Sequence, residues 1–394
     1  MPKKSQTSPE NRAKVISCFT NRKSLTQEDI IWTTHLSRPT VVDVLKSLIE
    51  DGIICKIGIG DSSKGRNPYL YGFTSNLYYS IGVDFDYPQL KIGIMNLSCQ
   101  VLIQNTLLVP PTLTPVQIIE YMLQQINKLL QQFSCEKSQF IGICISITGL
   151  INSTSGISIY AEKISGWKNI NLKEIFEGNF GITTYIKNDI NLMAQLTYET
   201  HPELPEDFIY IGIRTGIGMG IIQNGEICLG FKGNAGLLGH TTIEMDGDLC
   251  NCGKRGCLES IAGEQEILSR YIKLTGNKVE TDNSYETLIN LSKADDPNAQ
   301  IILTKASNAL ALSIANIVKI FEFPTVVLDG WPLALTEPFR QIFESTLRGN
   351  LFENISYDLN IIYYQSDPTE VIRACGSSVV KHYIKKDMIL YNYV

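Results

Sequence analysis

The chain has 394 residues, more than one domain usually contains, so we expect two or three units that each bury a core. The lysine-containing start lacks a following apolar run, and no 18-residue apolar stretch occurs, which predicts a cytoplasmic chain that does not span a membrane. The net charge of −6 argues against nucleic-acid binding by the whole surface, yet residues 1–66 carry 11 lysines and arginines against 7 acidic residues. A basic head on an acidic body favours phosphate binding confined to one end.

Residues 24–50 have the pattern of two short helices separated by a tight turn. Thr26 is followed three residues later by Asp29, which predicts a capped start for the first helix. Ser37 can cap the second helix. Pro39 is tolerated in its first turn because N–H groups at these positions make no hydrogen bond within the helix, so the N–H that proline lacks is not needed. Two short helices at this separation are typical of a helix-turn-helix.

The second of these helices has one apolar face. Its apolar residues recur at helical spacing: Val41, Val44, Leu45 and Leu48. This stripe leaves Arg38, Thr40 and Asp43 nearer the exposed side. We therefore expect Arg38 and Thr40 to meet base edges or phosphates in a major groove.

After Asp51-Gly52 the sequence becomes strand-like, and a polar loop containing Lys64-Gly65-Arg66 precedes a second strand, YLYGF. A hairpin with a basic tip after a recognition helix is a wing, so Lys64 and Arg66 are expected to enter a minor groove. These features predict a winged helix-turn-helix domain over residues 1–74 that binds operator DNA. The alternative is a small helical protein-docking module with a solvated basic loop.

From residue 78 onward strands and helices alternate, which predicts an α/β body. The first elements are YSIGVDF, LKIGIMNL, a helix over residues 115–132, and FIGICISI. Asn224-Gly225 lies between two strand-like segments and predicts a tight hairpin. Further along, the sequence predicts a long helix over residues 296–320, a buried strand VVLDG, and a closing helix over residues 370–385.

Three of the ten cysteines crowd into one short Gly-rich loop, CNCGKRGC. With the preceding histidine, three thiolates and one imidazole form the set that a closed, tetrahedral structural Zn²⁺ site uses. The expected ligands are His240, Cys250, Cys252 and Cys257. Four protein ligands leave no open position for a catalytic water. The alternatives are cysteines that merely pack, or a redox pair.

The winged helix, the loop CNCGKRGCLE that follows Gly239-His240, and the pair Asn188-Asp189 together resemble the ROK family of bacterial sugar-dependent repressors and sugar kinases. The resemblance covers essentially the whole chain. The added winged helix is typical of the repressor branch, which includes xylose-type and N-acetylglucosamine-type regulators. The resemblance implies an actin-like, ribonuclease-H-type body of two α/β lobes around a cleft, with residues 75–187 plus 375–394 in the first lobe and residues 188–374 in the second.

The resemblance also implies a site for a sugar or sugar-derivative effector. Its residues would be Gly149, Asn188, Asp189, His240 and Glu259. Asp189 matches the general base of the kinases, although on local sequence alone it can equally cap the following helix. Thr148 stands where proline is usual, and Leu237 stands where the family has a glutamate that accepts hydrogen bonds from sugar hydroxyls. Leucine cannot do so, which favours a ligand other than the common hexoses, or weak binding.

Three segments that would hold ATP in a ROK kinase are altered. They are Asp86-Tyr87-Pro88 in place of Gly-Gly-Thr, Arg214-Thr215-Gly216 in place of Gly-Thr-Gly, and Leu328-Asp329-Gly330-Trp331 in place of a small Gly-rich turn. Phosphate binding needs backbone N–H groups at such turns, and Pro88 has none. We therefore predict a transcriptional regulator without enzyme activity. The alternatives are a sugar kinase with residual or bifunctional activity, since Asp84 and Asp189 persist, and a regulator controlled by a protein partner.

We expect the chain to form a homodimer or homotetramer. One short helix and one wing contact too few base pairs for useful specificity, and a two-fold symmetric operator doubles those contacts.

Overall fold

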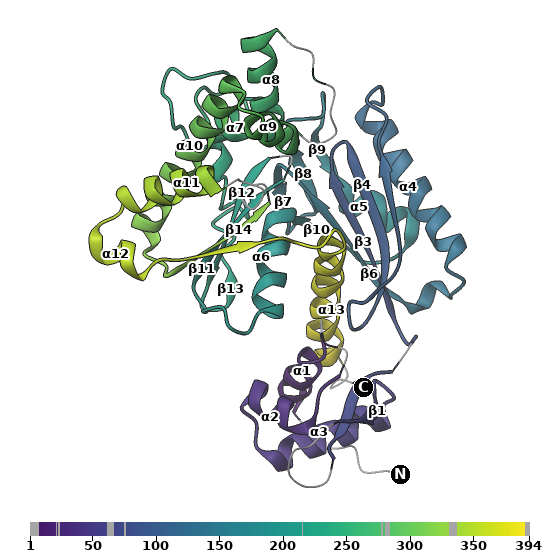
Figure 1. Cartoon of the computed structure of the whole chain (residues 1–394). Coiled ribbons are helices and arrows are strands. Elements are labelled where there is room, and N and C mark those ends of the chain that lie inside the picture. Colours follow the sequence, from purple (N-terminus) through teal and green to yellow (C-terminus); the bar gives the residue numbers. More distant parts are fainter. Residues whose placement is uncertain are drawn as a thin grey trace. The chain divides into compact units, whose positions relative to one another are not determined.

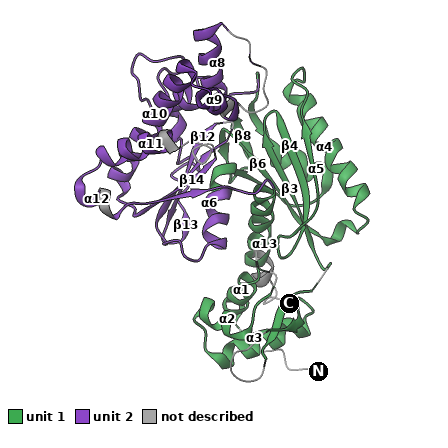
Figure 2. Cartoon of the chain, in the orientation of Figure 1, with its two compact units in different colours: residues 1–159, 165–192, 369–394 green, residues 160–164, 193–368 purple. Residues whose placement is uncertain are grey.

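The computed structural model describes residues 8–20, 22, 24–60, 67–74, 76–214, 216–276, 279, 284–330 and 337–390 (Figure 1). The chain divides into two compact units (Figure 2). Unit 1 comprises residues 1–159, 165–192 and 369–394, and unit 2 comprises residues 160–164 and 193–368. The winged helix is grouped within unit 1. The finer boundaries expected from the sequence, at residues 74, 187 and 374, remain predictions.

The first part of unit 1 contains three helices and a two-stranded sheet. They are α1 (Pro9–Ser17), α2 (Gln27–Thr34), α3 (Arg38–Glu50), β1 (Ile54–Ile59) and β2 (Tyr69–Phe73). Strands β1 and β2 pair antiparallel, as expected for the hairpin of a wing. The wing tip with Lys64 and Arg66 lies outside the described residues.

Side-chain caps define the starts of α2 and α3. Thr26 Oγ1 accepts a hydrogen bond from the backbone N–H of Asp29, and the Asp29 carboxylate accepts one from the N–H of Thr26 at 2.7 Å. Ser37 Oγ accepts a hydrogen bond from the N–H of Thr40 at 3.3 Å. A cap of this kind contributes about 1 kcal/mol to stability. Both predicted helix starts are confirmed.

The core of the winged helix extends into the C-terminal helix α13 (Glu370–Leu390). The four apolar residues predicted on α3 are buried in this core: Val41, Val44, Leu45 and Leu48. Val380 and Ile384 of α13 belong to the same core, and α13 lies against α1 (Figure 1). The rings of Tyr78 and Tyr383 extend the contact at a centroid distance of 5.5 Å. The winged helix therefore buries its core partly with residues from the far end of the chain.

A five-stranded sheet forms the centre of unit 1. Its strands are β3 (Tyr79–Asp86), β4 (Gln89–Asn96), β5 (Val101–Leu108), β6 (Phe140–Ile147) and β10 (Thr184–Asn188). They lie in the order β10-β6-β3-β4-β5; β3, β4 and β5 are successively antiparallel, whereas β6 and β10 run parallel to β3. Helix α13 packs closely on this sheet because Gly142 has no side chain: a Cβ there would lie 2.7 Å from Cγ1 of Val379.

The other elements of this part of the chain surround the sheet or extend it. They are α4 (Pro115–Gln132), the 3-10 helix η1 (Lys137–Gln139), α5 (Leu172–Phe180), and a three-stranded sheet of β7 (Leu150–Asn152), β8 (Ile157–Tyr160) and β9 (Lys168–Asn171). Helix α6 (Asp189–Thr200) follows β10, and the boundary between the units falls within it.

Unit 2 repeats the sheet topology of unit 1. Its strands are β11 (Phe208–Ile213), β12 (Ile217–Gln223), β13 (Glu226–Ile227), β14 (Thr325–Gly330) and β15 (Asn360–Tyr364). They lie in the order β13-β12-β11-β14-β15, with β11, β12 and β13 antiparallel and β14 and β15 parallel to β11. Asn224 and Gly225 form the predicted hairpin, each with a positive φ. Two sheets of one topology are as expected for an actin-like body.

The helices of unit 2 lie between β13 and β14 and between β14 and β15. They are the 3-10 helix η2 (Leu238–His240), α7 (Leu258–Ala262), α8 (Glu264–Thr275), α9 (Ser284–Lys293), α10 (Pro297–Phe321), α11 (Glu337–Gly349) and α12 (Glu353–Asp358). Among the described residues, α10 alone is long and apolar enough, by length and composition, to cross a membrane. Most of that stretch is buried, and its side chains form the core of unit 2 with those of β11 and β14. Helix α10 therefore has the environment of a core helix.

Candidate functional site

Three sulfur ligands and one nitrogen ligand converge in unit 2, on the segment between η2 and α7. The ligand atoms of His240, Cys250, Cys252 and Cys257 all lie within 4.8 Å of one another. Cys250 Sγ is 3.7 Å from His240 Nδ1, and Cys252 Sγ is 3.6 Å from Cys257 Sγ. A tetrahedral Zn²⁺ with bonds of about 2.3 Å to sulfur and about 2.0 Å to nitrogen separates its ligands by roughly 3.5 to 3.8 Å. The donor set and its spacing fit such an ion.

The local backbone brings these ligands together through a tight turn. Gly256 has a positive φ of 69°, and a Cβ at this position would lie 1.5 Å from the carbonyl oxygen of Glu244. Burial raises the pKa of the Cys250 and Cys257 thiols. In the absence of a cation, both thiols therefore keep their protons at neutral pH. A metal ion would replace these protons, since the thiolate is the form that binds zinc.

Two carboxylates lie on the other side of the His240 ring. Glu162 Oε1 is 3.8 Å from His240 Nε2, and Glu162, His240 and Glu259 each offer a ligand atom within 4.8 Å of the others. Glu259 is only 4% exposed, and its Oε2 accepts a hydrogen bond from the N–H of Ile217 at 3.0 Å. The structure thus brings His240 and Glu259 together, as two residues of the predicted sugar site. Glu162 was missed by sequence reasoning.

The remaining predicted sugar residues belong to unit 1. Asn188 ends β10, and its Oδ1 accepts a hydrogen bond from the N–H of Asn191 at 3.1 Å. The cap of α6 is therefore Asn188, and Asp189 is buried at the first position of the helix, so the alternative role of Asp189 as the cap is wrong. Gly149 lies between β6 and β7 with a φ of 91°, which favours glycine. Leu237 lies in unit 2 and is 43% exposed.

The first altered phosphate segment forms the turn between β3 and β4. Asp86 pairs with Gln89, so Tyr87 and Pro88 are the two residues of the turn. The carbonyl of Pro88 accepts a hydrogen bond from the N–H of Val109 at 2.8 Å. Because Pro88 has no N–H, this turn offers one donor fewer to a phosphate.

Asp329 of the third altered segment accepts two hydrogen bonds from within the protein. Asp329 of β14 is buried and accepts a hydrogen bond from the Tyr210 hydroxyl at 2.6 Å, and it accepts a second one from the N–H of Ser366 at 2.9 Å. Burial and the neighbouring Asp329 raise the pKa of Tyr210 well above its usual range. Trp331, and Thr215 of the second segment, lie outside the described residues.

The candidate DNA-binding surface is the exposed side of α3. Arg38 is exposed at the start of the helix and forms an ion pair with Glu28 of α2. The Thr40 hydroxyl lies 2.8 Å from Ser37 Oγ, so Thr40 takes part in the cap and is half-buried. Trp32 of α2 is 77% exposed, and the sequence analysis did not single it out.

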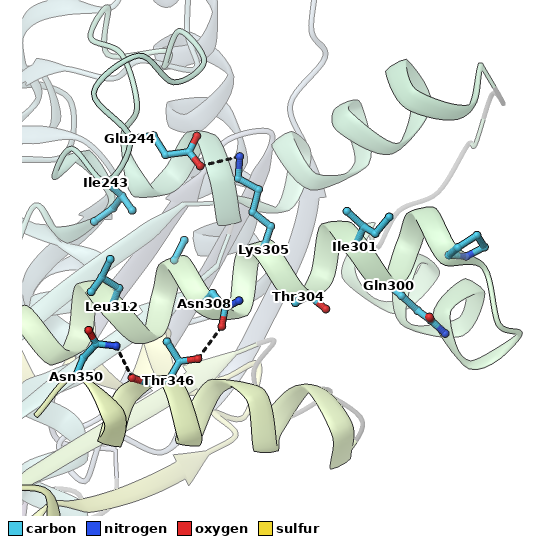
Figure 3. A pocket seen from close by; sticks show the side chains of 12 residues that line it. Ile243, Glu244, Gln300, Ile301, Thr304, Lys305, Asn308, Leu312, Thr346 and Asn350 are labelled. Carbon is cyan, nitrogen blue, oxygen red and sulfur yellow. Dashed lines mark hydrogen bonds and ion pairs between the residues drawn. The ribbon is translucent and has the colours of Figure 1, made fainter.

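A groove of about 840 Å³ lies elsewhere on unit 2, along α10 and α11 (Figure 3). Lys305 of α10 forms an ion pair of 2.7 Å with Glu244 of residues 241–257, the segment that we call the metal loop. Asn308 accepts a hydrogen bond of 2.7 Å from the Thr346 hydroxyl. None of the predicted sugar or metal residues line this groove. The groove touches the metal loop only through Ile243 and Glu244.

Residues 80–357, more than half of the chain, match the ROK family. The chain belongs to the ROK family. Over 381 residues this ROK protein is 26% identical to the xylose repressor of Caldicellulosiruptor bescii, an alignment that covers 94% of this chain and 95% of that protein. The predicted family and its repressor branch are thus confirmed.

Solved structures show the fold of this ROK protein. A ROK family transcriptional regulator, a homologue of the Escherichia coli MLC protein, superimposes with a TM-score of 0.77 at 20% identity and covers 97% of this chain and 98% of its own. The ROK hexokinase of Thermus thermophilus gives a TM-score of 0.62 at 20% identity and covers 78% of this chain and 99% of its own. The predicted actin-like α/β body with an N-terminal winged helix is confirmed.

Proposed function

We propose that this ROK protein is a DNA-binding transcriptional repressor of carbohydrate-utilisation genes, whose operator affinity is controlled by a sugar or sugar derivative. The observation that carries the proposal is a winged helix followed by a ROK body in one chain. The family match begins at residue 80, after β2 has ended. The hexokinase is matched over 99% of its length by 78% of this chain, so the chain contains more than a kinase body.

The proposed contacts to operator DNA come from α3 and from the wing. They are Arg38, Thr40, Lys64 and Arg66. Arg38 supports the proposal because it is exposed at the start of the recognition helix, and arginine is the residue that most often contacts guanine in a major groove. Its exposed partner Glu28 can be exchanged for DNA at little cost, because an exposed ion pair contributes at most about 1 kcal/mol.

The proposed effector residues are Gly149, Asn188, Asp189, His240 and Glu259. Hydroxyl-rich ligands need donors and acceptors at fixed positions, and these side chains supply both. His240 turns Nδ1 toward Cys250, so a metal on this nitrogen would leave Nε2–H as a hydrogen-bond donor.

We propose a structural Zn²⁺ held by the four residues that converge in unit 2: His240, Cys250, Cys252 and Cys257. The ion would cross-link the loop. With four protein ligands it would have no free coordination position for a catalytic water. The role of the chain's own residues is positional: the loop carries His240, and Cys257 immediately precedes α7 with Glu259.

We further propose that the body has lost ATP binding, which Pro88 and the hydrogen bonds of Asp329 support. The second candidate function is a sugar kinase with residual activity, which the hexokinase-like fold and the buried Asp189 favour. Sugar-dependent ATP turnover that disappears in Asp189→Asn would support the kinase instead. We place the protein in the cytoplasm as a homodimer or homotetramer, for the reason of operator symmetry given above.

The proposal is tested by selecting operator sequences from a random duplex pool with the full chain. We expect a two-fold symmetric site and a loss of at least tenfold in affinity in Arg38→Ala. Lys319→Ala removes an exposed cation of α10 and is the matched control, for which affinity stays unchanged. A selected sequence without symmetry, or equal effects of the two variants, contradicts the proposal. D-xylose, D-glucose or N-acetyl-D-glucosamine should then weaken binding to the selected site.

A further inference from the structure

Glu162 places a second carboxylate at His240, from a part of the chain that no motif marks. Its side chain is 12% exposed, and it accepts no hydrogen bond from any residue that the structure describes. The 3.8 Å between Glu162 Oε1 and His240 Nε2 is too long for a hydrogen bond. A single hydroxyl oxygen can nevertheless lie about 2.8 Å from both atoms, so the pair is spaced to hold one hydroxyl group between them.

Glu259 offers a further acceptor beside this pair. Its Oε2 is already used by the N–H of Ile217, while Oε1 accepts no hydrogen bond within the described part of the chain. One carboxylate oxygen of each glutamate and one ring nitrogen of His240 lie within 4.8 Å of one another, so the group offers carboxylate acceptors and an imidazole donor. A sugar hydroxyl matches this set, because it donates one hydrogen bond and accepts others.

The charge around this group is negative. Burial raises the pKa of Glu266, and the nearby charges of Glu259 and Glu162 raise it further, while Lys163 acts in the opposite direction. Glu162 and Glu259 also offer carboxylate oxygens within 4.8 Å of each other and of His240, so an anion placed there meets two carboxylates, and partial burial leaves this repulsion poorly screened. A phosphate ester bound at this place would meet like charge.

We propose that Glu162 is a specificity-determining residue of the effector site and that, with Glu259, it selects a neutral, unphosphorylated monosaccharide. The inference rests on the proposed function, in which His240 and Glu259 bind the sugar. It also changes the expectation for Leu237: the site contains a carboxylate, Glu162, that the sequence comparison at Leu237 did not count. A common hexose therefore stays a candidate ligand despite Leu237.

Glu162 has one competing role, which is to orient His240 for zinc. A ligating histidine often donates its other N–H to a carboxylate, and loss of that partner lowers metal affinity tenfold or more. The two roles differ in what a substitution changes. An orienting residue acts on zinc and sugar together, whereas a specificity-determining residue acts on sugar alone.

The test uses the full-length, zinc-loaded protein and calorimetric titration with matched pairs. The probes are D-xylose, D-glucose with D-glucose 6-phosphate, and N-acetyl-D-glucosamine with its 6-phosphate. We expect a neutral sugar to bind and its 6-phosphate to bind at least tenfold more weakly. Glu162→Gln should lower the affinity for the neutral sugar at least tenfold, with zinc content unchanged. The ratio between the affinities for the neutral sugar and for its 6-phosphate should become smaller. Asp246→Asn removes an exposed charge between η2 and α7, near the proposed zinc ligands, and should change neither the sugar affinity nor the zinc content.

Each outcome is decisive. A 6-phosphate that binds more tightly than its parent sugar, or an unchanged affinity in Glu162→Gln, overturns this inference and leaves the sugar-responsive repressor standing. Loss of zinc together with sugar affinity in Glu162→Gln assigns the orienting role and also overturns it. If no probe binds and none alters operator binding, the proposed function fails, and the inference fails with it.

Discussion

The two sheets have one topology, but their third strands differ. In unit 1, β5 has eight residues and pairs with β4 from Gln89 to Met95. In unit 2, β13 has two residues and pairs with β12 only at Ile222 and Gln223. The chain then continues to α7 through one 3-10 turn and two isolated bridges. Unit 1 completes its sheet with a full-length third strand. In unit 2 the residues that follow the short β13 lead instead into the metal loop.

This difference separates two sources of order. Backbone hydrogen bonds and a packed helix hold the strands of unit 1, and neither requires a ligand. The loop of unit 2 is held by turn and bridge hydrogen bonds, such as the one of 2.8 Å from the N–H of Cys250 to the carbonyl of Lys254, and not by a strand ladder. The four side chains that converge there would cross-link it further at the proposed zinc. Chelation should therefore affect the two units very differently.

The largest expected effect comes from Cys252→Ala. We expect complete loss of zinc and of the response to sugar, with operator affinity in the absence of sugar retained, because unit 1 does not contain the loop. Elemental analysis and amide hydrogen exchange measure the two outcomes. Cys228→Ala changes a cysteine of unit 2 outside the ligand set and should keep both zinc and response. Zinc-free wild-type protein, carefully prepared, would falsify the metal centre.

Asp189→Ala should abolish the response to sugar without removing zinc, which separates the contribution of unit 1 from that of the metal loop. Operator affinity without sugar should be unchanged, as measured by fluorescence anisotropy. Asp189→Asn keeps the size of the side chain and controls for packing, since Asp189 is buried. A normal response in both Asp189→Ala and Glu259→Ala would show that the effector binds elsewhere.

Gly142→Val tests the packing of unit 1. The new side chain would meet Val379 of α13, where even a Cβ lies only 2.7 Å away. Overpacking of this kind costs about 1–3 kcal/mol. We expect a lower midpoint of thermal unfolding with zinc content unchanged, opposite to the pattern for Cys252→Ala. An unchanged midpoint would show that α13 packs less tightly on this sheet than the structure indicates.

The smallest expected effect is that of Lys305→Ala. Its ion pair with Glu244 joins α10 to the metal loop, but both side chains are more than a third exposed. Such a pair contributes at most about 1 kcal/mol, and less at high salt. We expect a small fall in stability at low salt that disappears at high salt. A large loss of zinc in this variant would mean that α10, and not the four ligands, holds the loop.

Features encoded by neighbouring residues were predictable. The caps at Thr26 and Ser37, the apolar face of α3, the hairpin at Asn224-Gly225 and the convergence of three cysteines with His240 all follow from local spacing. Periodicity and turn residues act over a few positions, so a single sequence records them.

Features that depend on distant pairs were not predictable. Glu162 reaches His240 across almost eighty residues, and Val380 enters the core of the winged helix from the other end of the chain. Nor could the sequence distinguish Asn188 from Asp189 as the cap, since both residue types cap helices well and only the position at which α6 begins decides between them.

The shared core of the winged helix and α13 has a consequence during synthesis of the protein. The ribosome makes α1, α2 and α3 first, but Val380 and Ile384 emerge only after the whole body has been translated. A nascent or truncated chain therefore lacks part of the hydrophobic core beneath its DNA-binding helices. We therefore expect a chain that ends before α13 to fold its winged helix less stably than the full chain does.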